Sequence, residues 1–438
     1  MYVFSSLSRL LLSDASQYPE DERAAPMTVT VLGKPYEVQV QYHVLRNITY
    51  VLLDAPVFRQ QTKSEPYPPR MDDLSSAIYY SAWNQCIAQA INRFPVDLYH
   101  INDYHGSVAP LYILPRTIPA CLSLHNAEFQ GLWPMRTKHE RDEVCSVFNL
   151  STELVQRYVQ FGEVFNLLHA GASYLRLHQQ GFGAVGVSKK YGKRSYARYP
   201  IFWGLKKVGQ LPNPDPSDTG EWDKKLPKES EIRIDPEFEA GRPELKRQAQ
   251  EWAGLEQNPR AELFVFVGRW SMQKGIDLIA DVFPSILESN PNVQLVTIGP
   301  VIDLYGKFAA LKLDRMMKLY PGRVFSKPVF TALPPFIFSG AEFALIPSRD
   351  EPFGLVAVEF GRKGALGVGA RVGGLGQMVS FCVSFVSLAS LEHAICRCAH
   401  PFSARCTDTS SSLAGGTQLN RQRRHICFVN SSKQSTKP

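Results

Sequence analysis

Arg269 and Lys274 lie five positions apart in a segment that follows a strand-like apolar run and precedes a helix-like one. A guanidinium, an ammonium and the free N–H groups at the start of a helix could converge on a diphosphate. A contact between unit charges near 4 Å contributes about 4 kcal/mol at an effective dielectric constant of 20. The spacing alone is equally compatible with a solvated loop that carries two ordinary surface cations.

A second segment carries two carboxylates, Glu351 before a predicted helix and Glu359 within its second turn. Gly354 stands at the start of that helix, where the lack of a Cβ lets backbone N–H groups approach an anion. Carboxylates also accept hydrogen bonds from sugar hydroxyl groups. Stabilisation of the helix dipole is an alternative explanation for Glu351, but not for Glu359, whose neighbours are apolar.

Histidines follow two strand-like runs nearer the N-terminus. His100 and His105 flank Asp103 in the string HINDYHG, and His125 lies in the string LSLHNAEFQG. A histidine at the end of a strand more often makes a structural hydrogen bond than acts as a catalyst. Three of them with one carboxylate favour a functional site. Zinc is a weaker interpretation, because closely spaced ligand pairs and a cysteine partner are missing.

Alternating strands and helices must position these residues. From residue 262 onward we predict strands at 262–268, 293–299 and 343–347, followed by helices at 276–288, 305–320 and 354–363. Three successive strand-to-helix units predict a doubly wound α/β domain. In such a domain ligands bind beyond the carboxyl ends of the strands, where both charged segments lie.

The first half predicts a related organisation, with strands at 29–32, 37–42, 48–53, 97–103 and 120–126 and a helix at 73–92. This alternation favours a parallel sheet covered by helices on both faces. The string GFGAVG at 181–186 matches a dinucleotide-binding fingerprint. We reject that match, because no strand is predicted before it and a basic run replaces the apolar helix after it.

Composition divides the chain into an atypical N-terminus at 1–20, a domain at 21–210, a connector at 211–258 with a helix at 243–257, a second domain at 259–378 and a tail at 379–438. The tail contains seven Lys or Arg and two acidic residues, so its net charge is +5. The formal net charge of the whole chain is +7, which leaves +2 for residues 1–378. A nearly neutral body argues against a nucleic-acid partner. We expect the tail to be disordered or aberrant sequence.

Cysteine usage and hydropathy bear on the compartment. No apolar stretch reaches the roughly 20 residues that a membrane-spanning helix needs, and the first residues lack the features of a secretory signal. Cys86, Cys121 and Cys145 are scattered through apolar or helical contexts, which is typical of reduced thiols. We expect a soluble, cytoplasmic chain without a transmembrane segment.

The chain resembles a known family in four runs of sequence: PVDLYHINDYHG, CLSLHNAEFQGLWP, FVGRWSMQKG and PSRDEPFGLVAVEFGRKGALGVGARVGGLGQM. The family is the glycogen and starch synthase type of retaining glycosyltransferase, and within it the enzymes that make α-1,3-glucan for fungal cell walls. The resemblance covers about residues 21–378. It implies the GT-B architecture, in which two Rossmann-like doubly wound domains face a cleft.

This resemblance implies transfer of glucose from UDP-glucose to an α-glucan without a metal or other cofactor. The implied donor-binding residues come from the two charged segments of the second domain: Arg269, Lys274, Gly354, Leu355 and Glu359. The two cations would hold the diphosphate and neutralise the leaving nucleotide, while Glu359 would bind the ribose. Glu351 would lie against the transferred glucose as a catalytic residue.

In the first domain, the resemblance implies that His125 contacts the glucose and stabilises oxocarbenium character at its anomeric carbon. Asp103 is a second catalytic candidate, and His105 and Asn126 would line the acceptor side. In members of this family the equivalent domain starts with a strand and a Lys-x-Gly-Gly loop. We find no such motif at 1–20, so we expect the first domain to be incomplete.

Two alternatives to an active synthase follow from the sequence. The first is a catalytically inactive, truncated remnant that binds nucleotide sugar or glucan and does not turn over. The second is a sugar phosphorylase on the same architecture, which is the least favoured because no motif marks a pyridoxal phosphate lysine. If the full-length proteins of this family are membrane-associated at the cytoplasmic face of the plasma membrane, the association would come from segments outside this chain.

Overall fold

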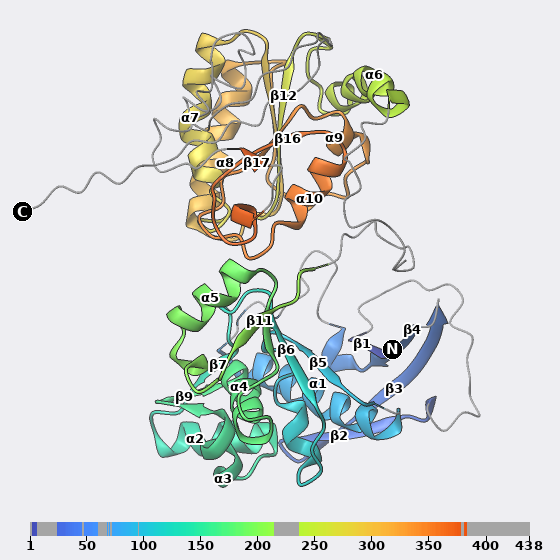
Figure 1. Cartoon of the computed structure of the whole chain (residues 1–438), viewed down its shortest axis with the longest axis vertical. Coiled ribbons are helices and arrows are strands. Elements are labelled where there is room, and N and C mark those ends of the chain that lie inside the picture. Colours follow the sequence, from blue (N-terminus) through green and yellow to red (C-terminus); the bar gives the residue numbers. More distant parts are fainter. Residues whose placement is uncertain are drawn as a thin grey trace, which may run out of the picture. The chain divides into compact units, whose positions relative to one another are not determined.

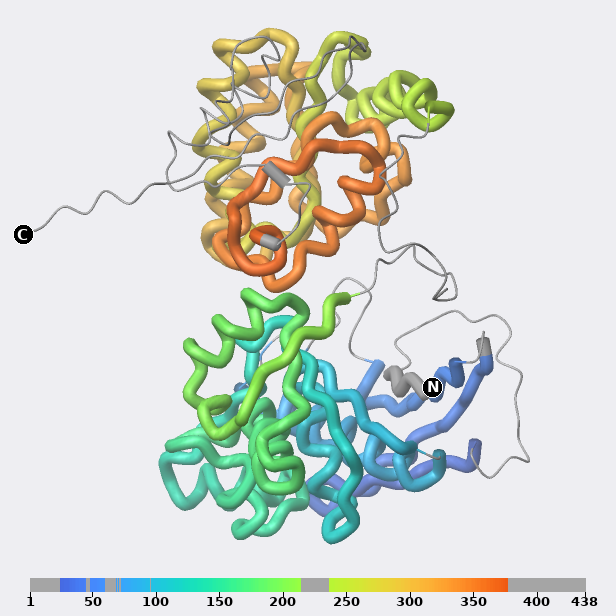
Figure 2. Tube along the Cα trace, viewed as in Figure 1, coloured from blue at the N-terminus to red at the C-terminus, as the bar shows by residue number. Residues whose placement is uncertain are grey.

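The computed structural model describes residues 2–6, 24–45, 48–59, 68, 70, 72–94, 96–213, 236–377 and 381–382. The chain divides into two compact units, Met1–Pro212 and Asn213–Pro438. Figure 2 follows the first unit from blue to green and the second from yellow-green to red. Within the described residues, every helix is too short or too polar to cross a membrane. The predicted segments 1–20 and 379–438 lie almost entirely outside those residues.

The first unit contains a mixed sheet with the strand order β1-β4-β3-β2. Its strands are β1 (Tyr2–Ser6), β2 (Met27–Val31), β3 (Lys34–Leu45) and β4 (Ile48–Asp54). The strands β2, β3 and β4 pair antiparallel, so the predicted parallel arrangement is wrong here. Leu32 and Gly33 form the turn between β2 and β3 with positive φ angles of 52° and 71°, and such a two-residue turn joins only antiparallel strands.

The second sheet of this unit has the order β11-β10-β6-β5 and is parallel throughout. Its strands are β5 (Tyr99–Asn102), β6 (Ala120–Leu124), β10 (Ala184–Gly186) and β11 (Val208–Gln210). The helices α1 (Leu74–Arg93), α4 (Leu167–His178) and α5 (Lys189–Arg198) accompany it (Figure 1). The predicted parallel pairing is confirmed for β5 and β6.

The first unit also contains a small three-stranded sheet with the order β7-β9-β8 and two further α-helices. These elements are β7 (Leu132–Pro134), α2 (Lys138–Phe148), α3 (Thr152–Leu154), β8 (Gln160–Phe161) and β9 (Val164–Asn166). The string GFGAVG covers the turn before β10 and β10 itself, so it is not a strand-to-helix loop. The basic run after it forms α5, a helix that the sequence analysis did not predict, which begins at a Ser188 cap.

The second unit is built on one parallel sheet with the order β14-β13-β12-β15-β16-β17. The strands are β12 (Glu262–Val267), β13 (Val293–Ile298), β14 (Val324–Lys327), β15 (Phe343–Ile346), β16 (Leu366–Gly369) and β17 (Phe381–Cys382). The helices are α6 (Pro236–Trp252), α7 (Ile276–Ser289), α8 (Leu304–Leu319), α9 (Phe336–Ser339) and α10 (Leu355–Arg362). Numbered along the chain, the strand order is that of a Rossmann fold, which confirms the predicted doubly wound domain.

Helices cover both faces of this sheet (Figure 1). One core joins α7 and α8 to the sheet, and the other joins α6, α9 and α10 to its opposite face. Successive residues of β12 alternate between them, with Phe264 in the first core and Leu263 and Val265 in the second. The predicted helix at 243–257 lies instead at Pro236–Trp252 and packs in the second core.

Phe264 lies at the centre of the first core. Its ring is stacked on that of Phe343 with centroids 4.5 Å apart, and it meets Phe283 edge to face at 5.7 Å. Its side chain is completely buried. A cavity left at this position would therefore remove contacts with both the neighbouring strand and α7.

We predict that Phe264→Ala lowers the free energy of unfolding of the second unit by about 3–5 kcal/mol, because it removes buried apolar contacts and leaves a cavity. The matched control is Phe308→Ala, which truncates a ring that is 64% exposed. Urea unfolding followed by circular dichroism measures both. Equal, small effects of the two substitutions would contradict the assignment of the core.

Candidate functional site

The two charged loops of the second unit meet where the sheet reverses its direction of winding. β12 and β15 are hydrogen-bonded neighbours at the centre of the sheet. β12 leads to α7 on one face, whereas β15 leads to α10 on the other. The crevice outside the carboxyl ends of two such strands is where doubly wound sheets bind ligands.

Lys274 and Glu351 form an ion pair between these loops. Nζ of Lys274 lies 2.6 Å from Oε2 of Glu351, and Oγ of Ser348 donates to the same oxygen at 2.9 Å. The Glu351 side chain is 9% exposed and that of Lys274 is 22% exposed. Loss of the ammonium would leave a largely buried carboxylate without its cation, which is strongly unfavourable.

Arg349 binds the β15 loop to the β12 loop and to α7. Its guanidinium pairs with the Asp277 carboxylate through two hydrogen bonds of 2.8 and 2.6 Å. The same side chain donates to the Met272 carbonyl at 2.8 Å, and the Arg349 backbone N–H donates to the Gln273 carbonyl at 2.9 Å. Four contacts from one residue thus hold the Lys274 loop against the Glu351 loop.

Two glycines without a Cβ allow close backbone contacts around the Lys274 and Glu351 loops. A Cβ on Gly275, whose φ is +72°, would lie 2.2 Å from the carbonyl oxygen of Pro347. A Cβ on Gly373, whose φ is +47°, would lie 1.9 Å from the carbonyl oxygen of Glu351. Both distances are far shorter than any real contact. A larger residue at Gly275 would push the Lys274 and Glu351 loops apart, and one at Gly373 would push the segment after β16 away from the Glu351 loop.

Two helices begin at this edge without a side-chain cap. α7 starts after Gly275 and α10 after Gly354, both in the left-handed conformation, and neither start is capped by a side chain. By contrast α1, α2, α4, α5 and α8 each begin at a residue whose side chain accepts a backbone N–H. Uncapped N–H groups and the positive end of the helix dipole favour a bound anion.

The other predicted donor residues belong to the same loops and helices. Arg269 is exposed, and its guanidinium donates to Oε1 of Gln273 at 3.3 Å. Leu355 and Glu359 are both exposed and lie four residues apart on α10, so they share one face of that helix. Direct contact of these residues with a substrate stays a prediction.

In the first unit, Asp103 joins the loops that follow β5 and β6. Its carboxylate accepts backbone N–H groups from His125 at 2.8 Å and from Asn126 at 3.1 and 3.2 Å. Burial raises the pKa of Asp103 to about 6, against the lowering effect of those N–H groups. These contacts give Asp103 a positioning role, whereas the sequence analysis had placed it among the catalytic residues; a direct catalytic role stays a prediction.

The three histidines make separate hydrogen bonds in this region. Nε2 of His125 lies 3.0 Å from Oδ1 of Asn102, and Nε2 of His100 lies 2.5 Å from Oγ of Ser123. Burial lowers the pKa of all three imidazoles, that of His105 to about 4. Among the residues that the structure describes, no three His, Cys, Asp or Glu side chains are grouped as metal ligands.

Two tyrosine hydroxyl groups form hydrogen bonds with the loops that follow β5 and β6, and neither contact was predicted from the sequence. Nδ1 of His105 lies 3.2 Å from the hydroxyl group of Tyr80, which belongs to α1. The hydroxyl group of Tyr191 on α5 accepts the backbone N–H of Ala127 at 2.7 Å. Neither contact has a signal in the sequence, because a tyrosine at helical spacing ordinarily belongs to a core.

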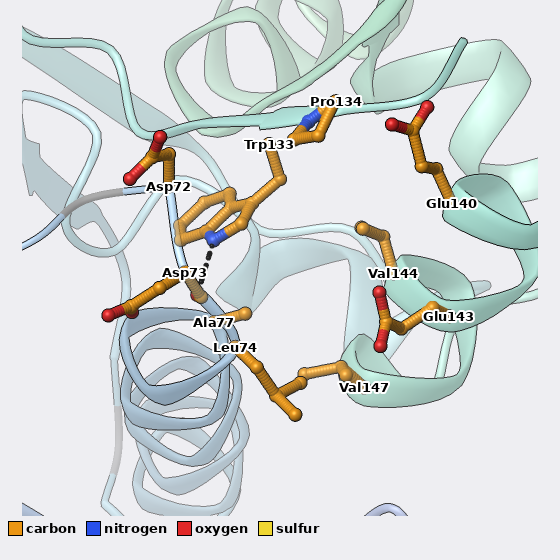
Figure 3. A pocket seen from close by; sticks show the side chains of 10 residues that line it. All are labelled: Asp72, Asp73, Leu74, Ala77, Trp133, Pro134, Glu140, Glu143, Val144 and Val147. Atoms are coloured by element: carbon orange, nitrogen blue, oxygen red, sulfur yellow. Dashed lines mark hydrogen bonds between the residues drawn. The ribbon is translucent and has the colours of Figure 1, made fainter. Parts of the chain in front are cut away.

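A separate pocket of the first unit is lined by apolar residues and carboxylates (Figure 3). At its base the indole N–H of Trp133 donates to the Asp73 carbonyl at 2.9 Å. The Asp73 carboxylate caps α1, and Glu140 forms a capping box with Thr137 at the start of α2. These acids have structural roles in holding the two helices, and the predicted site residues are not among those that line this pocket.

Comparison with known proteins gives matches in both units. Residues 10–176 match the family model described as the starch synthase catalytic domain, and residues 261–399 match the model described as glycosyl transferases group 1. The chain is 67% identical over 375 residues to the cell wall α-1,3-glucan synthase ags1 of Schizosaccharomyces pombe, which covers 85% of the chain and 15% of that protein. It is 62% identical over 417 residues to the cell wall α-1,3-glucan synthase mok13 of the same organism, in an alignment that covers 95% of this chain and 17% of mok13.

Solved structures show the same architecture. The catalytic domain of starch synthase IV from Arabidopsis thaliana, bound to ADP and acarbose, aligns with a TM-score of 0.68 and 16% identity, covering 86% of this chain and 79% of that one. A sucrose-phosphate synthase from Thermosynechococcus elongatus aligns with a TM-score of 0.50 and 15% identity, covering 90% and 78%. At these identities the likeness establishes the fold.

The fold and the two family matches define a glycosyltransferase with the GT-B architecture, and residues 10–176 are similar to the starch synthase type within it. More particularly, it is similar to one segment of the cell wall α-1,3-glucan synthases and spans 15% to 17% of the length of the two relatives above. The family and the fold class that the sequence analysis predicted are therefore confirmed.

We predict that Arg349 and Asp277 are energetically coupled by about 1–2 kcal/mol in a double-mutant cycle of Arg349→Gln and Asp277→Asn, because their two hydrogen bonds are charge-assisted. The control cycle uses Lys318→Gln and Asp314→Asn, an ion pair on α8 whose side chains are 75% and 62% exposed. That pair should give a coupling of about 0.5 kcal/mol or less. Urea unfolding measures both cycles, and equal coupling energies would contradict the bridging role of Arg349.

A second prediction concerns pH. Because the pKa of His105 is lowered from 6.5 to about 4 in the folded chain, the unfolded chain binds a proton first as the pH falls. The contribution of the neutral His105 side chain to the free energy of unfolding is therefore complete above pH 6.5, and it is lost as the pH falls towards 4. His105→Gln should remove this loss, which is on the order of 2–3 kcal/mol.

Urea midpoints for the wild type and His105→Gln at several pH values between these limits test this prediction. Asp103 contributes with the opposite sign, since its raised pKa makes its ionisation destabilising as the pH rises towards about 6. Its contribution is present in both proteins and cancels in their difference. Parallel pH dependence of the two proteins would contradict the burial of a neutral His105.

Proposed function

We propose that the chain is the synthase portion of a retaining glucosyltransferase that moves glucose from UDP-glucose to an α-glucan, in the synthesis of cell-wall α-1,3-glucan. The observation that carries the proposal is the Lys274–Glu351 ion pair at the point where the winding of the sheet reverses. The named relatives, which are α-1,3-glucan synthases, support the polymer and its linkage. A cytoplasmic location, at the inner face of the plasma membrane for the complete protein, belongs to the same proposal.

The donor diphosphate would lie against Arg269, Lys274 and the uncapped N-terminal ends of α7 and α10. Cleavage of the bond between the anomeric carbon and the diphosphate leaves additional negative charge on the nucleotide. Fixed cations and backbone N–H groups at that position stabilise this charge as it develops, and they need no reorganisation during the reaction. Lys274 is already held in place by Glu351 before any ligand binds.

Glu351 and His125 would act on the sugar. An ionised carboxylate accepts hydrogen bonds from hydroxyl groups of the glucose and favours positive charge at the anomeric carbon. The lowered pKa of His125 keeps its imidazole neutral near pH 7. Its Nε2–H donates to Oδ1 of Asn102, which leaves Nδ1 to accept a hydrogen bond from a hydroxyl group of the sugar. Asp103 and Asn102 fix the backbone and the ring of His125.

We predict that Arg269→Ala, Lys274→Ala and Glu351→Gln each lower kcat/KM for UDP release from UDP-glucose by about 10²–10³-fold, since each removes a charge aimed at the reacting groups. Arg260→Ala is the matched control, because Arg260 is an exposed cation that precedes β12 at the opposite end of the strand. That variant should retain wild-type turnover. Unchanged turnover in all three site variants would show that the residue roles are wrong.

Calorimetric titration of the wild-type chain with UDP-glucose and with ADP-glucose separates the alternatives. Binding of UDP-glucose together with glucan-dependent UDP release supports the synthase. Binding without turnover supports the inactive remnant. A clear preference for ADP-glucose would contradict the proposed donor, and failure to bind either nucleotide sugar would contradict both the synthase and the remnant.

A further inference from the structure

The helix α8 has two apolar faces, and only one is buried. Gly306, Ala309, Leu313 and Met316 lie against the core that α7, α8 and the sheet share. The opposite face presents large apolar side chains to solvent: Leu304 (65% exposed), Tyr305 (46%), Phe308 (64%), Leu311 (69%) and Leu319 (61%). Exposed apolar residues scattered singly are ordinary, but several of them together on one helix face mark an interaction surface.

Helical spacing places these residues on one stripe. Leu304, Phe308 and Leu311 follow one another at intervals of four and three residues, which brings them onto the same side of an α-helix. Leu319 follows Leu311 two turns later. Figure 1 shows α8 beside α7 in the layer that covers one face of the sheet, so this stripe is the outer side of that layer.

Basic side chains are interleaved with the apolar ones on the exposed side of α8. Arg315 continues the stripe one turn after Leu311, and Lys307 borders it. Among the residues that the structure describes, neither Arg315 nor Lys307 has an ion-pair partner, whereas Lys312 pairs with Asp281 and Lys318 with Asp314. The exposed face of α8 therefore combines a large apolar area with uncompensated positive charge.

We infer that this face, defined by Leu304, Tyr305, Phe308, Leu311, Arg315 and Leu319, docks onto an anionic lipid bilayer surface. Leu and Phe side chains enter the acyl boundary, the tyrosine lies at the headgroup level and the cations reach the phosphates. The inference concerns peripheral contact by the side of a folded helix. It is independent of the nucleotide-sugar site, since none of these residues belongs to that site.

Charge argues against the other occupants. A second copy that packed α8 against α8 would bring Arg315 and Lys307 close to their own counterparts, with like charges opposed. The chain's segment 379–438 carries a net charge of +5 from seven basic and two acidic residues, so it is also a poor electrostatic match. An anionic membrane satisfies the apolar area and the positive charge together.

Cosedimentation of the full chain with phosphatidylcholine vesicles, with and without phosphatidylserine, tests the inference. We expect binding that requires phosphatidylserine and weakens as salt rises. The double variant Phe308→Gln/Leu311→Gln should bind about tenfold or more weakly because it removes two apolar side chains from the acyl boundary. The variant Lys307→Gln/Arg315→Gln should lose most of the phosphatidylserine dependence.

The matched control is Val44→Gln/Leu98→Gln, which removes two apolar side chains of the first unit that are 60% and 56% exposed and should leave vesicle binding unchanged. Circular dichroism and thermal unfolding confirm that each variant is folded. Absence of wild-type binding to the phosphatidylserine vesicles, or equal binding by Phe308→Gln/Leu311→Gln, would overturn the inference. Sedimentation velocity that showed a wild-type dimer converted to monomer by the same variant would assign the face to a second copy instead.

Discussion

The ion pair between Lys274 and Glu351 depends on one topological constraint, the reversal of winding between β12 and β15. At this point two strand-to-helix loops lie next to each other although the helices that they lead to cover opposite faces of the sheet. Lys274 comes from a loop that leads to α7, and Glu351 from a loop that leads to α10. A strand order that did not place β15 beside β12 would separate the two residues, even with the same local sequence.

The surroundings of this pair explain how a charged contact is kept in a mostly buried position. Desolvation of an ion pair is costly, and it is compensated only by good geometry and further hydrogen bonds. Ser348 supplies a second donor to Glu351, Arg349 binds the two loops together, and Gly275 allows the close backbone approach. A cation held in this way is already positioned for an anionic ligand, so binding does not have to order it.

The sequence predicted β12, β13 and β15 and the helices α7, α8 and α10 that follow them, because each depends on local pattern, whereas the short strands β14 and β16 and the short helix α9 were not predicted. The apolar run at Glu262–Val267 and the helical period of Ile276–Ser289 were readable directly. The partners of Arg349 were not, because Asp277 is 72 residues away in the chain and nothing local indicates which guanidinium meets which carboxylate. The partners of Asp103 were not predictable for a similar reason, since they are backbone N–H groups, which leave no mark in a sequence.

In the first unit, hydrophobic periodicity predicted neither the pairing of the first strands nor the helix α5. Strand-like runs between Met27 and Asp54 were correctly located but wrongly assigned to a parallel sheet, because the turn at Leu32 and Gly33 decides the pairing and leucine is unusual at a positive φ angle. The helix α5 was not predicted because its buried residues are Tyr191, Gly192 and Ser195, which do not form an apolar period. In both cases tertiary packing overrides the local signal.

A crystal structure of the chain with UDP tests the central claim most directly, because it locates the diphosphate without reference to turnover. The account predicts that the diphosphate oxygens lie within hydrogen-bond distance of the Arg269 guanidinium and the Lys274 ammonium, at the N-terminal ends of α7 and α10. A nucleotide bound elsewhere, or bound at this edge with both cations directed away from it, would contradict the account.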